Sequence, residues 1–298
     1  MDPRVMEALR EAGVPCRENE PFSRHTSMGV GGPAAVMVFP RSADELRGAL
    51  KVRKDLEAPH RILGAGSNLI VTDAGLDEVV INTGQMCQVE VAEDGVVTAE
   101  AGANLTQAVV RSCRAGWKGL ERAVGIPGSV GGAAVMNAGA YGFSIGDVVR
   151  EVVTYDAAGE RGEAPGDWSF EYRRSSIPAG SVVASVAVGL SQGDPEELGR
   201  ELRELQKQRV VGQPVGRSAG CIFKNPPGGH AGKIMDDLGL KGRRRGGAVV
   251  SPEHANFIVN DGDASAADIL ELLESVRETV SHETGIDLEP EVKIWGAR

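Results

Sequence analysis

The segment at residues 124–142, VGIPGSVGGAAVMNAGAYG, is unusually dense in glycine. It holds six glycines, with Ser129, Asn137 and Tyr141 among them. An ordinary turn needs one or two glycines, whereas backbone that approaches another surface closely needs a residue without a Cβ atom at each point of contact. A run of this length therefore predicts backbone wrapped round a flat or phosphate-bearing ligand.

A second glycine loop lies upstream, in HRILGAGSNLIVTDAG. Gly64 and Gly66 directly follow a β-rich run and precede Ser67 and Asn68. Such a loop can turn successive backbone N–H groups toward a phosphate, although an ordinary tight turn is the better explanation of this loop taken alone. The third glycine of the Rossmann fingerprint is missing. Two loops of this kind together favour a large dinucleotide, because one pyrophosphate needs donors on more than one side.

Composition and charge exclude several classes of protein. The 298 residues carry a net charge of −10 and only 4% aromatic residues, which argues against a nucleic-acid partner, since such proteins need a basic field and stacking rings. The N-terminus has no apolar signal-peptide run, and no stretch approaches the roughly 18 apolar residues of a membrane span. We therefore expect a cytoplasmic protein without membrane insertion and without an evident obligate protein partner.

The cysteines and the one basic cluster give weaker signals. The four cysteines form no CxxC pair, so we expect neither a metal site nor a disulfide framework; they are Cys16, Cys87, Cys113 and Cys221. The basic cluster at residues 241–245 has two interpretations, a solvated loop or a contact for phosphates.

Local patterns predict an α+β fold with four helices. Caps and periodicity place these helices at residues 3–12, 43–56, 196–209 and 265–285. Short β-rich runs lie between them, without the regular alternation of a doubly wound sheet: residues 34–40, 60–66, 78–82, 88–102, 150–160, 181–190, 248–251, 255–260 and 291–295. Two runs contain hairpin signals, at Asp94 with Gly95 and at Ala158 with Gly159. The stretch SQGDPEE predicts a domain boundary after residue 195.

Six motifs now point to one family. GAGSNLIV, GIPGSVGG with NAGAYG, FEYRRSSI, GCIFKNP, GAVVSPEHANFIVN and LEPEVKIWG occur in the order seen in the UDP-N-acetylenolpyruvoylglucosamine reductase (UDP-N-acetylmuramate dehydrogenase) family, and the chain resembles that family, in its compact subtype, over residues 22–296. The resemblance implies a two-subdomain FAD-binding fold of the vanillyl-alcohol oxidase type at residues 1–195, divided near residue 82. A C-terminal α+β substrate domain would follow at residues 196–298.

The resemblance also implies cofactors and a reaction. NADPH would reduce a noncovalent FAD, which would then reduce the enolpyruvyl ether of the nucleotide sugar to UDP-N-acetylmuramate for the cell wall. The residues expected to contact FAD are Gly64, Ala65, Gly66, Ser67, Asn68, Leu69, Gly125, Ile126, Pro127, Gly128, Ser129, Gly131 and Gly132. We expect His25 to be a surface residue rather than a covalent flavin link.

Three residues match the family's catalytic positions. Arg173, in FEYRRSSI, would clamp the substrate carboxylate through its forked donors. Cys221, in GCIFKNP, stands where many members carry serine and would be the general acid, since a thiol gives up a proton more readily than an alkyl hydroxyl. Glu291, in LEPEVKIW, would orient or stabilise the enolate-like oxygen. Without the family, Arg173 could belong to a surface pair, Cys221 could fill a core, and Glu291 could be an exposed strand residue.

Substrate-binding residues are harder to choose. Lys224 and Asn225 follow Cys221 and would suit the UDP diphosphate and the sugar. Arg209 could assist them, or it could only complement the dipole at the end of its helix. His254 and Asn256 could simply satisfy a buried turn. Two other functions share these features: a sugar or alcohol oxidase on the same fold, and a noncatalytic nucleotide-sugar binding protein.

Overall fold

The computed structural model describes residues 2–156, 159–163 and 168–296. The chain divides into two compact units, which are described separately. Unit one comprises Met1–Asn19, Ala35–Ala65 and Asp77–Gln208, and unit two comprises Glu20–Ala34, Gly66–Leu76 and Arg209–Arg298. Two short N-terminal segments therefore pack with the C-terminal residues, whereas the domain boundary after residue 195 remains a prediction.

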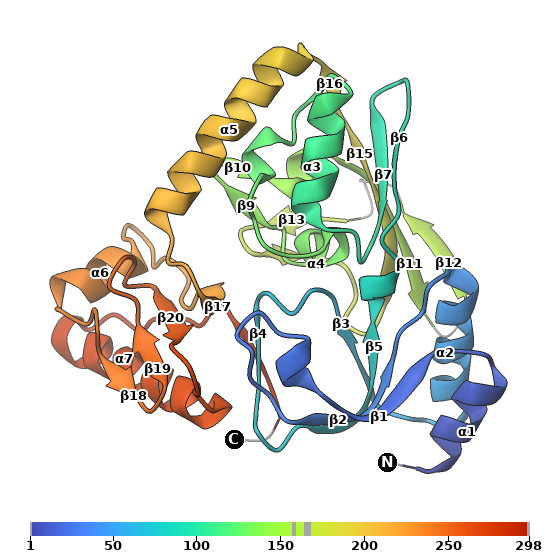
Figure 1. The fold of residues 1–298 in the computed structure, drawn as a ribbon, viewed down its shortest axis with the longest axis horizontal. Coiled ribbons are helices and arrows are strands. Elements are labelled where there is room, and N and C mark those ends of the chain that lie inside the picture. Colours follow the sequence, from blue (N-terminus) through green and yellow to red (C-terminus); the bar gives the residue numbers. More distant parts are fainter. Residues whose placement is uncertain (1, 157–158, 164–167, 297–298) are drawn as a thin grey trace. The chain divides into compact units, whose positions relative to one another are not determined.

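The first part of unit one is a four-stranded sheet with two helices. The strand order is β1-β2-β5-β3, and β3 and β5 are parallel, with His60 opposite Val79. Helices α1 and α2 contact one another (Figure 1), and their apolar faces meet the sheet in a core that includes Leu9, Val38 and Leu46. The elements are α1 (Arg4–Glu11), β1 (Cys16–Pro21), β2 (Pro33–Val38), α2 (Ala43–Asp55), β3 (His60–Leu63) and β5 (Leu76–Asn82).

The second part of unit one is an antiparallel five-stranded sheet with its own core. The strand order is β12-β11-β15-β7-β6, and helices α3 and α4 contribute to the core with Val109 and Ala134. The elements are β6 (Val89–Val91), β7 (Val96–Glu100), α3 (Leu105–Arg114), α4 (Val130–Val135), β11 (Val149–Asp156), β12 (Gly159–Glu163), β15 (Val182–Gly189) and α5 (Pro195–Gly212). Helix α5 passes from unit one into unit two at Arg209.

Both hairpin predictions concern this sheet. The hairpin at Asp94 and Gly95 is confirmed, because β6 and β7 pair antiparallel on either side of it and Gly95 has φ +85°. At the other hairpin, β11 pairs antiparallel with β12, and Asp156 lies opposite Gly159. The turn residue Ala158 lies outside the described residues.

Unit two has one core under a four-stranded antiparallel sheet of order β17-β20-β19-β18. Its elements are β17 (Arg217–Cys221), α6 (Ala231–Asp237), β18 (Arg244–Arg245), β19 (Ala248–Val250), β20 (Phe257–Asn260) and α7 (Ala266–Thr284). The predicted capping box of α7 is present, since Ser265 and Asp268 bond reciprocally, and Gly285 ends the helix in the left-handed conformation. Met28, Val30 and Ile70 join this core from the N-terminal segments.

The remaining elements are short. In unit two, β4 (Leu69–Val71) pairs parallel with β21 (Lys293–Trp295). Unit one has three short pairs of strands: β8 (Trp117–Lys118) with β16 (Ser191–Gln192), β9 (Gly139–Ala140) with β10 (Phe143–Ser144), and β13 (Phe170–Glu171) with β14 (Arg174–Ser175). The 3-10 helices are η1 (Phe22–Arg24), η2 (Thr83–Gln85), η3 (Glu121–Ala123) and η4 (Ile145–Asp147). The predicted α+β class is confirmed. Among the described residues, no helix is long and apolar enough to cross a membrane.

Candidate active site

The start of the first glycine loop lies beside the second glycine loop in unit one. Gly64 directly follows β3, and a Cβ atom built on it would lie 2.5 Å from the Ser129 hydroxyl oxygen. Ser129 is 3% exposed, accepts a hydrogen bond from the backbone N–H of Gly132 and forms an isolated β-bridge with Asn104. Segments 65 residues apart in sequence therefore form one surface without side-chain bulk.

Glycine is required at further points of the second loop. A Cβ atom on Gly131 would lie 2.7 Å from the Cβ of Ala101, and Gly125 and Gly128 have φ +73° and +142°, which favour glycine. Backbone amides and a serine hydroxyl are donors suited to phosphate oxygens. The residues present therefore fit the phosphate-bearing cofactor that the sequence predicts.

The later residues of the first loop belong to unit two. Gly66 has φ +62°, and a Cβ atom on it would lie 2.0 Å from the His25 carbonyl oxygen. The backbone N–H of Ser27 donates to the Gly66 carbonyl at 3.1 Å. His25, which we expect at the surface, is partly buried: its side chain is 18% exposed, and its Nε2 lies 2.8 Å from the buried Glu20 carboxylate. The backbone of His25 and Ser27 therefore packs against the first glycine loop at Gly66 and hydrogen-bonds to it.

Arg173 occupies the tip of the β13–β14 hairpin in unit one. Its φ of +58° is rare for a residue with a side chain and costs about 1–2 kcal/mol. The guanidinium carbon lies 5.1 Å from the centroid of the Tyr172 ring. Two bonds hold the hairpin to the glycine-rich segment: the Asn137 amide donates to the Glu171 carbonyl at 2.9 Å, and the Ser175 hydroxyl donates to the Val135 carbonyl at 2.8 Å. Strained backbone of this kind is common at functional sites, where contacts with the surrounding structure stabilise it.

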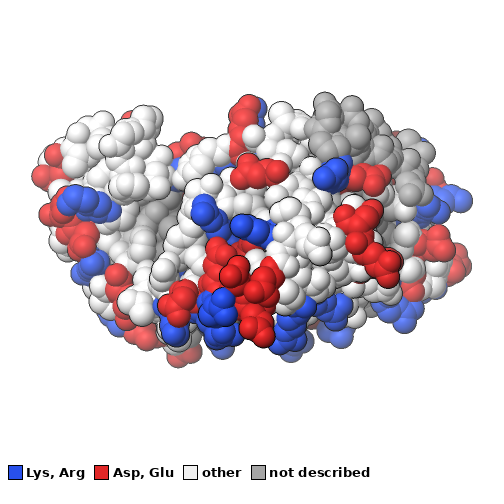
Figure 2. All heavy atoms as spheres, turned by 90° about the horizontal axis from the view of Figure 1, so that it is seen from above, with Lys and Arg blue, Asp and Glu red and all other residues white. Residues whose placement is uncertain are grey.

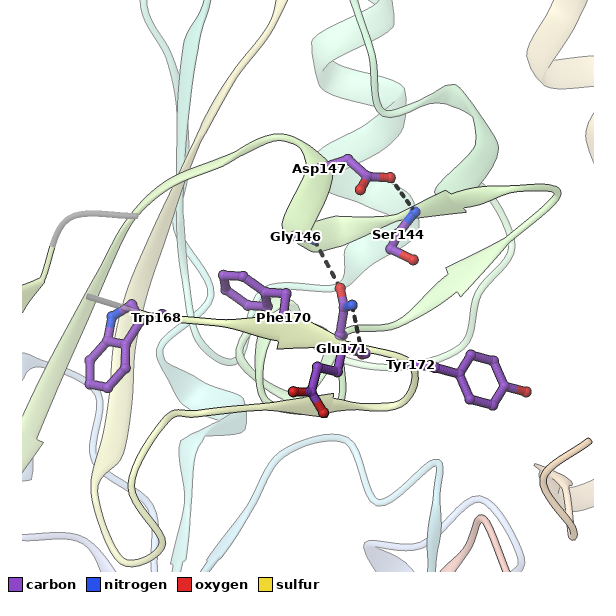
Figure 3. Close-up of a pocket in the computed structure, with 8 residues that line it drawn as sticks. Ser144, Gly146, Asp147, Trp168, Phe170, Glu171 and Tyr172 are labelled. Atoms are coloured by element: carbon purple, nitrogen blue, oxygen red, sulfur yellow. Dashed lines mark hydrogen bonds between the residues drawn. The ribbon is translucent and has the colours of Figure 1, made fainter. Parts of the chain in front are cut away.

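A pocket of about 500 Å³ lies beside this hairpin (Figure 3). Asn137 lines it, and the oxygen of its side chain accepts from the Gly146 N–H at 3.0 Å while its nitrogen donates to the Glu171 carbonyl. Within the described part of the chain, the buried indole nitrogen of Trp168 has no hydrogen-bond partner. The lining residues are Asn137, Ser144, Gly146, Asp147, Trp168, Phe170, Glu171 and Tyr172.

Cys221 and Glu291 lie on adjacent backbone segments of unit two. The N–H of Glu291 donates to the carbonyl of Ile222 at 2.7 Å, and Phe223 pairs with Pro290 in an isolated antiparallel bridge. The Asn68 amide reaches the Glu291 carbonyl at 3.2 Å. The structure therefore brings two of the three predicted catalytic residues together with the first glycine loop.

The predicted substrate-binding residues have different surroundings. The Lys224 ammonium bonds the Glu289 carboxylate at 2.6 Å, and the two residues also share a backbone bond of 2.8 Å. The Asn225 side-chain oxygen accepts from the Ala231 N–H at the start of α6. Arg209 lies in the last turn of α5, so its helix-end alternative stays open.

Comparison with known proteins gives a consistent result over nearly the whole chain. Residues 33–163 match the profile of an FAD binding domain, and residues 212–295 match the C-terminal domain of UDP-N-acetylenolpyruvoylglucosamine reductase. The reductase of Carboxydothermus hydrogenoformans is 38% identical over 97% of both chains, and that of Moorella thermoacetica is 41% identical over 93% of this chain and 92% of the other. The chain belongs to the UDP-N-acetylenolpyruvoylglucosamine reductase family. The solved reductase (MurB) of Thermus caldophilus is 39% identical, with a TM-score of 0.82 over 95% of this chain and 99% of that chain.

The basic cluster at residues 241–245 is paired with other side chains of unit two. Each of its four cations already has a partner within unit two: Lys241 with Asp236 at 2.7 Å, Arg243 with Thr279 at 2.7 Å, Arg244 with Asp261, and Arg245 with Glu271 at 2.5 Å. Basic and acidic side chains also adjoin one another on the face drawn in Figure 2. These pairs favour the solvated-loop interpretation.

The sequence did not single out several residues that hold this reductase-family site together. Asn137 supports the Arg173 hairpin, and Glu289 pairs with Lys224. Asn256 was noted only for a buried turn, yet its side chain bonds both backbone groups of Phe223. The neighbouring His254 accepts from the Asn256 N–H, and burial lowers the pKa of its imidazole. The only sequence signal for these residues is that they lie within the six motifs that resemble the family.

Proposed function

We propose that this chain reduces the enolpyruvyl double bond of UDP-N-acetylenolpyruvoylglucosamine to give UDP-N-acetylmuramate for peptidoglycan synthesis, using noncovalent FAD and NADPH. Within a member of this family, one observation carries the proposal: the bond from the Glu291 N–H to the Ile222 carbonyl. That bond joins the backbone of Glu291 to the residue that follows Cys221, which supports a site in which a carboxylate and a thiol act near one carbon atom.

The cofactor would be held by the backbone of residues 64–69 and 125–132 with the Ser129 hydroxyl. Bound FAD would supply the hydride that the methylene carbon of the substrate accepts. The chain contributes the surroundings: glycines that admit close approach, and donors for the phosphates.

Arg173 would bind the carboxylate of the enolpyruvyl group. As hydride reaches the methylene carbon, negative charge develops on the neighbouring carbon and spreads into that carboxylate, so a fixed cation beside it lowers the barrier. Arginine suits a planar carboxylate because its guanidinium offers two parallel donors. The strained hairpin fixes the start of this side chain in place before substrate arrives.

Cys221 would donate the proton that completes the reaction at the neighbouring carbon. Glu291 would orient or stabilise the enolate-like oxygen. Lys224, with Asn225 and Arg209, would bind the diphosphate and sugar of the nucleotide. Because Lys224 already contacts the Glu289 carboxylate at 2.6 Å, the diphosphate would share that ammonium with Glu289.

We infer that the enzyme works in the cytoplasm, where a reducing environment keeps a catalytic thiol reduced. Its partner would be the small nucleotide sugar, and the net charge of −10 does not favour nucleic acid. The FAD-binding and C-terminal matches, at residues 33–163 and 212–295, agree with a boundary after residue 195, which we retain as part of the proposal.

Separate half-reactions test this function. The purified protein should be yellow, bleach with NADPH, and regain its colour with the enolpyruvyl nucleotide sugar but poorly with oxygen. Cys221→Ser should retain substantial activity, whereas Cys221→Ala should still bleach with NADPH but recolour slowly. An alanine variant that turns over like the wild type would remove Cys221 as the acid. Hydrogen peroxide as the main product would instead indicate an oxidase.

A further inference from the structure

Asn256 makes three hydrogen bonds to the two residues that follow Cys221. Its side-chain oxygen accepts from the Phe223 N–H at 3.0 Å, and its side-chain nitrogen donates to the Phe223 carbonyl at 2.8 Å. Its backbone carbonyl accepts from the Ile222 N–H at 2.9 Å. The Asn256 side-chain amide thereby satisfies both backbone groups of Phe223, as a paired strand would, immediately before β20 begins.

The opposite edge of the same segment bonds to the Glu291 region. The Ile222 carbonyl accepts from the Glu291 N–H at 2.7 Å, and the Lys224 N–H donates to the Glu289 carbonyl at 2.8 Å. Residues 222–224 are therefore bonded on both edges, by Asn256 and by residues 289–291. Asn256 also directly precedes Phe257, which lies opposite Cys221 in the pairing of β17 with β20.

Burial makes the Asn256 bonds necessary. Asn256 is 3% exposed, and Ile222 and Phe223 are 0% and 1% exposed. The pairing of β17 with β20 shifts register between Ser218 and Cys221 and ends at Cys221, opposite Phe257, so beyond this point the bonds to Ile222 and Phe223 come from Asn256. Without the amide, the N–H and carbonyl of Phe223 would be buried without partners, which is strongly unfavourable.

We propose that Asn256 is a positioning residue for the reductase reaction, which sets the backbone at Ile222 and Phe223 and so fixes Cys221 relative to Glu291. The inference rests on the proposed function, because it assigns importance to the geometry of those two residues. Asn256 need not touch the substrate or the cofactor.

The test is an isosteric substitution, Asn256→Asp, in the flavin-loaded protein. The aspartate keeps the acceptor for the Phe223 N–H but, when ionised, sets a second acceptor against the Phe223 carbonyl. Protonation restores a donor, so the damage should shrink as pH falls. The matched control is Asn260→Asp, at the end of the strand β20 that Asn256 directly precedes. Asn260 is 6% exposed and likewise accepts from one N–H, of Ala264, and donates to one carbonyl, of Met28.

Two measurements separate positioning from general stability. The first is the rate of flavin recolouring by the enolpyruvyl nucleotide sugar. The second is the pH dependence of iodoacetamide labelling at Cys221, with exposed Cys87 in the same molecule as the reference. Other titratable groups near Asn256 and residues 221–224 are present in the wild type and in both variants, so their effects cancel in the ratio to wild type; they are Lys224, Glu253, His254, Glu289 and Glu291.

Asn256→Asp should slow recolouring at about pH 8 by roughly tenfold or more, the scale of one lost buried hydrogen bond. The ratio to wild type should recover several-fold near pH 6, and bleaching by NADPH should stay normal. The midpoint of Cys221 labelling should move to higher pH, while Cys87 labelling is unchanged. Asn260→Asp should leave both Cys221 measurements as in the wild type.

An unchanged Cys221 labelling profile in Asn256→Asp would overturn the proposal, and so would an equal change in Asn260→Asp. Labelling does not depend on turnover, so a shifted profile with normal recolouring would count against the catalytic role of Cys221 and leave the positioning intact. If Asn256→Asp does not fold, Asn256→Ser and Asn260→Ser carry the same comparison.

Discussion

Replacement of Gly66 by alanine measures how closely the first glycine loop is packed. Gly66 is buried, with φ +62°, and an added Cβ atom would lie 2.0 Å from the His25 carbonyl oxygen. Real Cβ atoms essentially never come within 3.0 Å of such an atom, so either the loop or the backbone at His25 must move by about 1 Å. That movement also strains the bond from the Ser27 N–H to the Gly66 carbonyl.

Gly285 supplies the matched control within the same unit. It ends α7 with φ +70°, and nothing lies within 4 Å of a Cβ atom built on it. Gly285→Ala should therefore cost only the left-handed conformation, about 1 kcal/mol. Gly66→Ala carries the same cost and adds an overpacking cost of about 1–3 kcal/mol. The free energy of unfolding should thus fall by about 2–4 kcal/mol in Gly66→Ala.

Urea unfolding and a flavin fluorescence titration check both consequences. Because the loop is proposed to contact FAD, Gly66→Ala should weaken FAD affinity by at least about tenfold, or 1.4 kcal/mol. Gly285→Ala should bind FAD like the wild type. Equal unfolding costs for the two variants would refute the packing argument, and an unchanged FAD affinity in Gly66→Ala would refute the placement of FAD on this loop.

Three further predictions concern other parts of the chain. Asp73 accepts from the N–H groups of Ala266 and Ala267 at the start of α7, so Asp73→Ala should lower the free energy of unfolding by about 1–2 kcal/mol in urea titrations. Burial raises the pKa of the Cys113 thiol to about 12, so iodoacetamide at about pH 8 should label Cys87 but leave Cys113 unmodified until the protein unfolds. Burial lowers the pKa of His254 below its unfolded value; the unfolded state then binds more protons, so stability should fall as pH drops through about 6.5, and His254→Gln should reduce that loss in thermal unfolding.

Sequence patterns predicted the elements whose signals are local. The capping residues of α2 and α7 and the hairpin at Gly95 act within a few residues, so they could be identified directly. Helix α3 was missed although Asn104 caps it and its buried positions recur at helical spacing. Strand β1 could not be predicted, because its sequence CRENEP is polar and mostly exposed at the edge of the sheet.

Contacts between residues far apart in the sequence could not be predicted from local patterns. No local pattern shows that Asp73 caps α7, or that the Asn260 amide bonds the Met28 carbonyl 232 residues away. The composition of unit two from three separated segments follows from such contacts. Likewise, FEYRRSSI identified Arg173 but not its left-handed backbone, since a positive φ at arginine is imposed by the hairpin around it.

The bonds around residue 221 give a physical reason why this position could carry either cysteine or serine. The backbone that follows residue 221 is held by Asn256, which bonds Ile222 and Phe223 on one edge, and by Glu291 and Glu289, which bond Ile222 and Lys224 on the other. These bonds use backbone groups and the Asn256 side-chain amide. Exchange of a hydroxyl for a thiol at residue 221 therefore changes the chemistry of the proposed proton donor while leaving these bonds in place. On this argument Cys221→Ser should keep the stability of the wild type, whereas Asn256→Ser, which retains the thiol proposed as the acid, should lose both stability and recolouring rate.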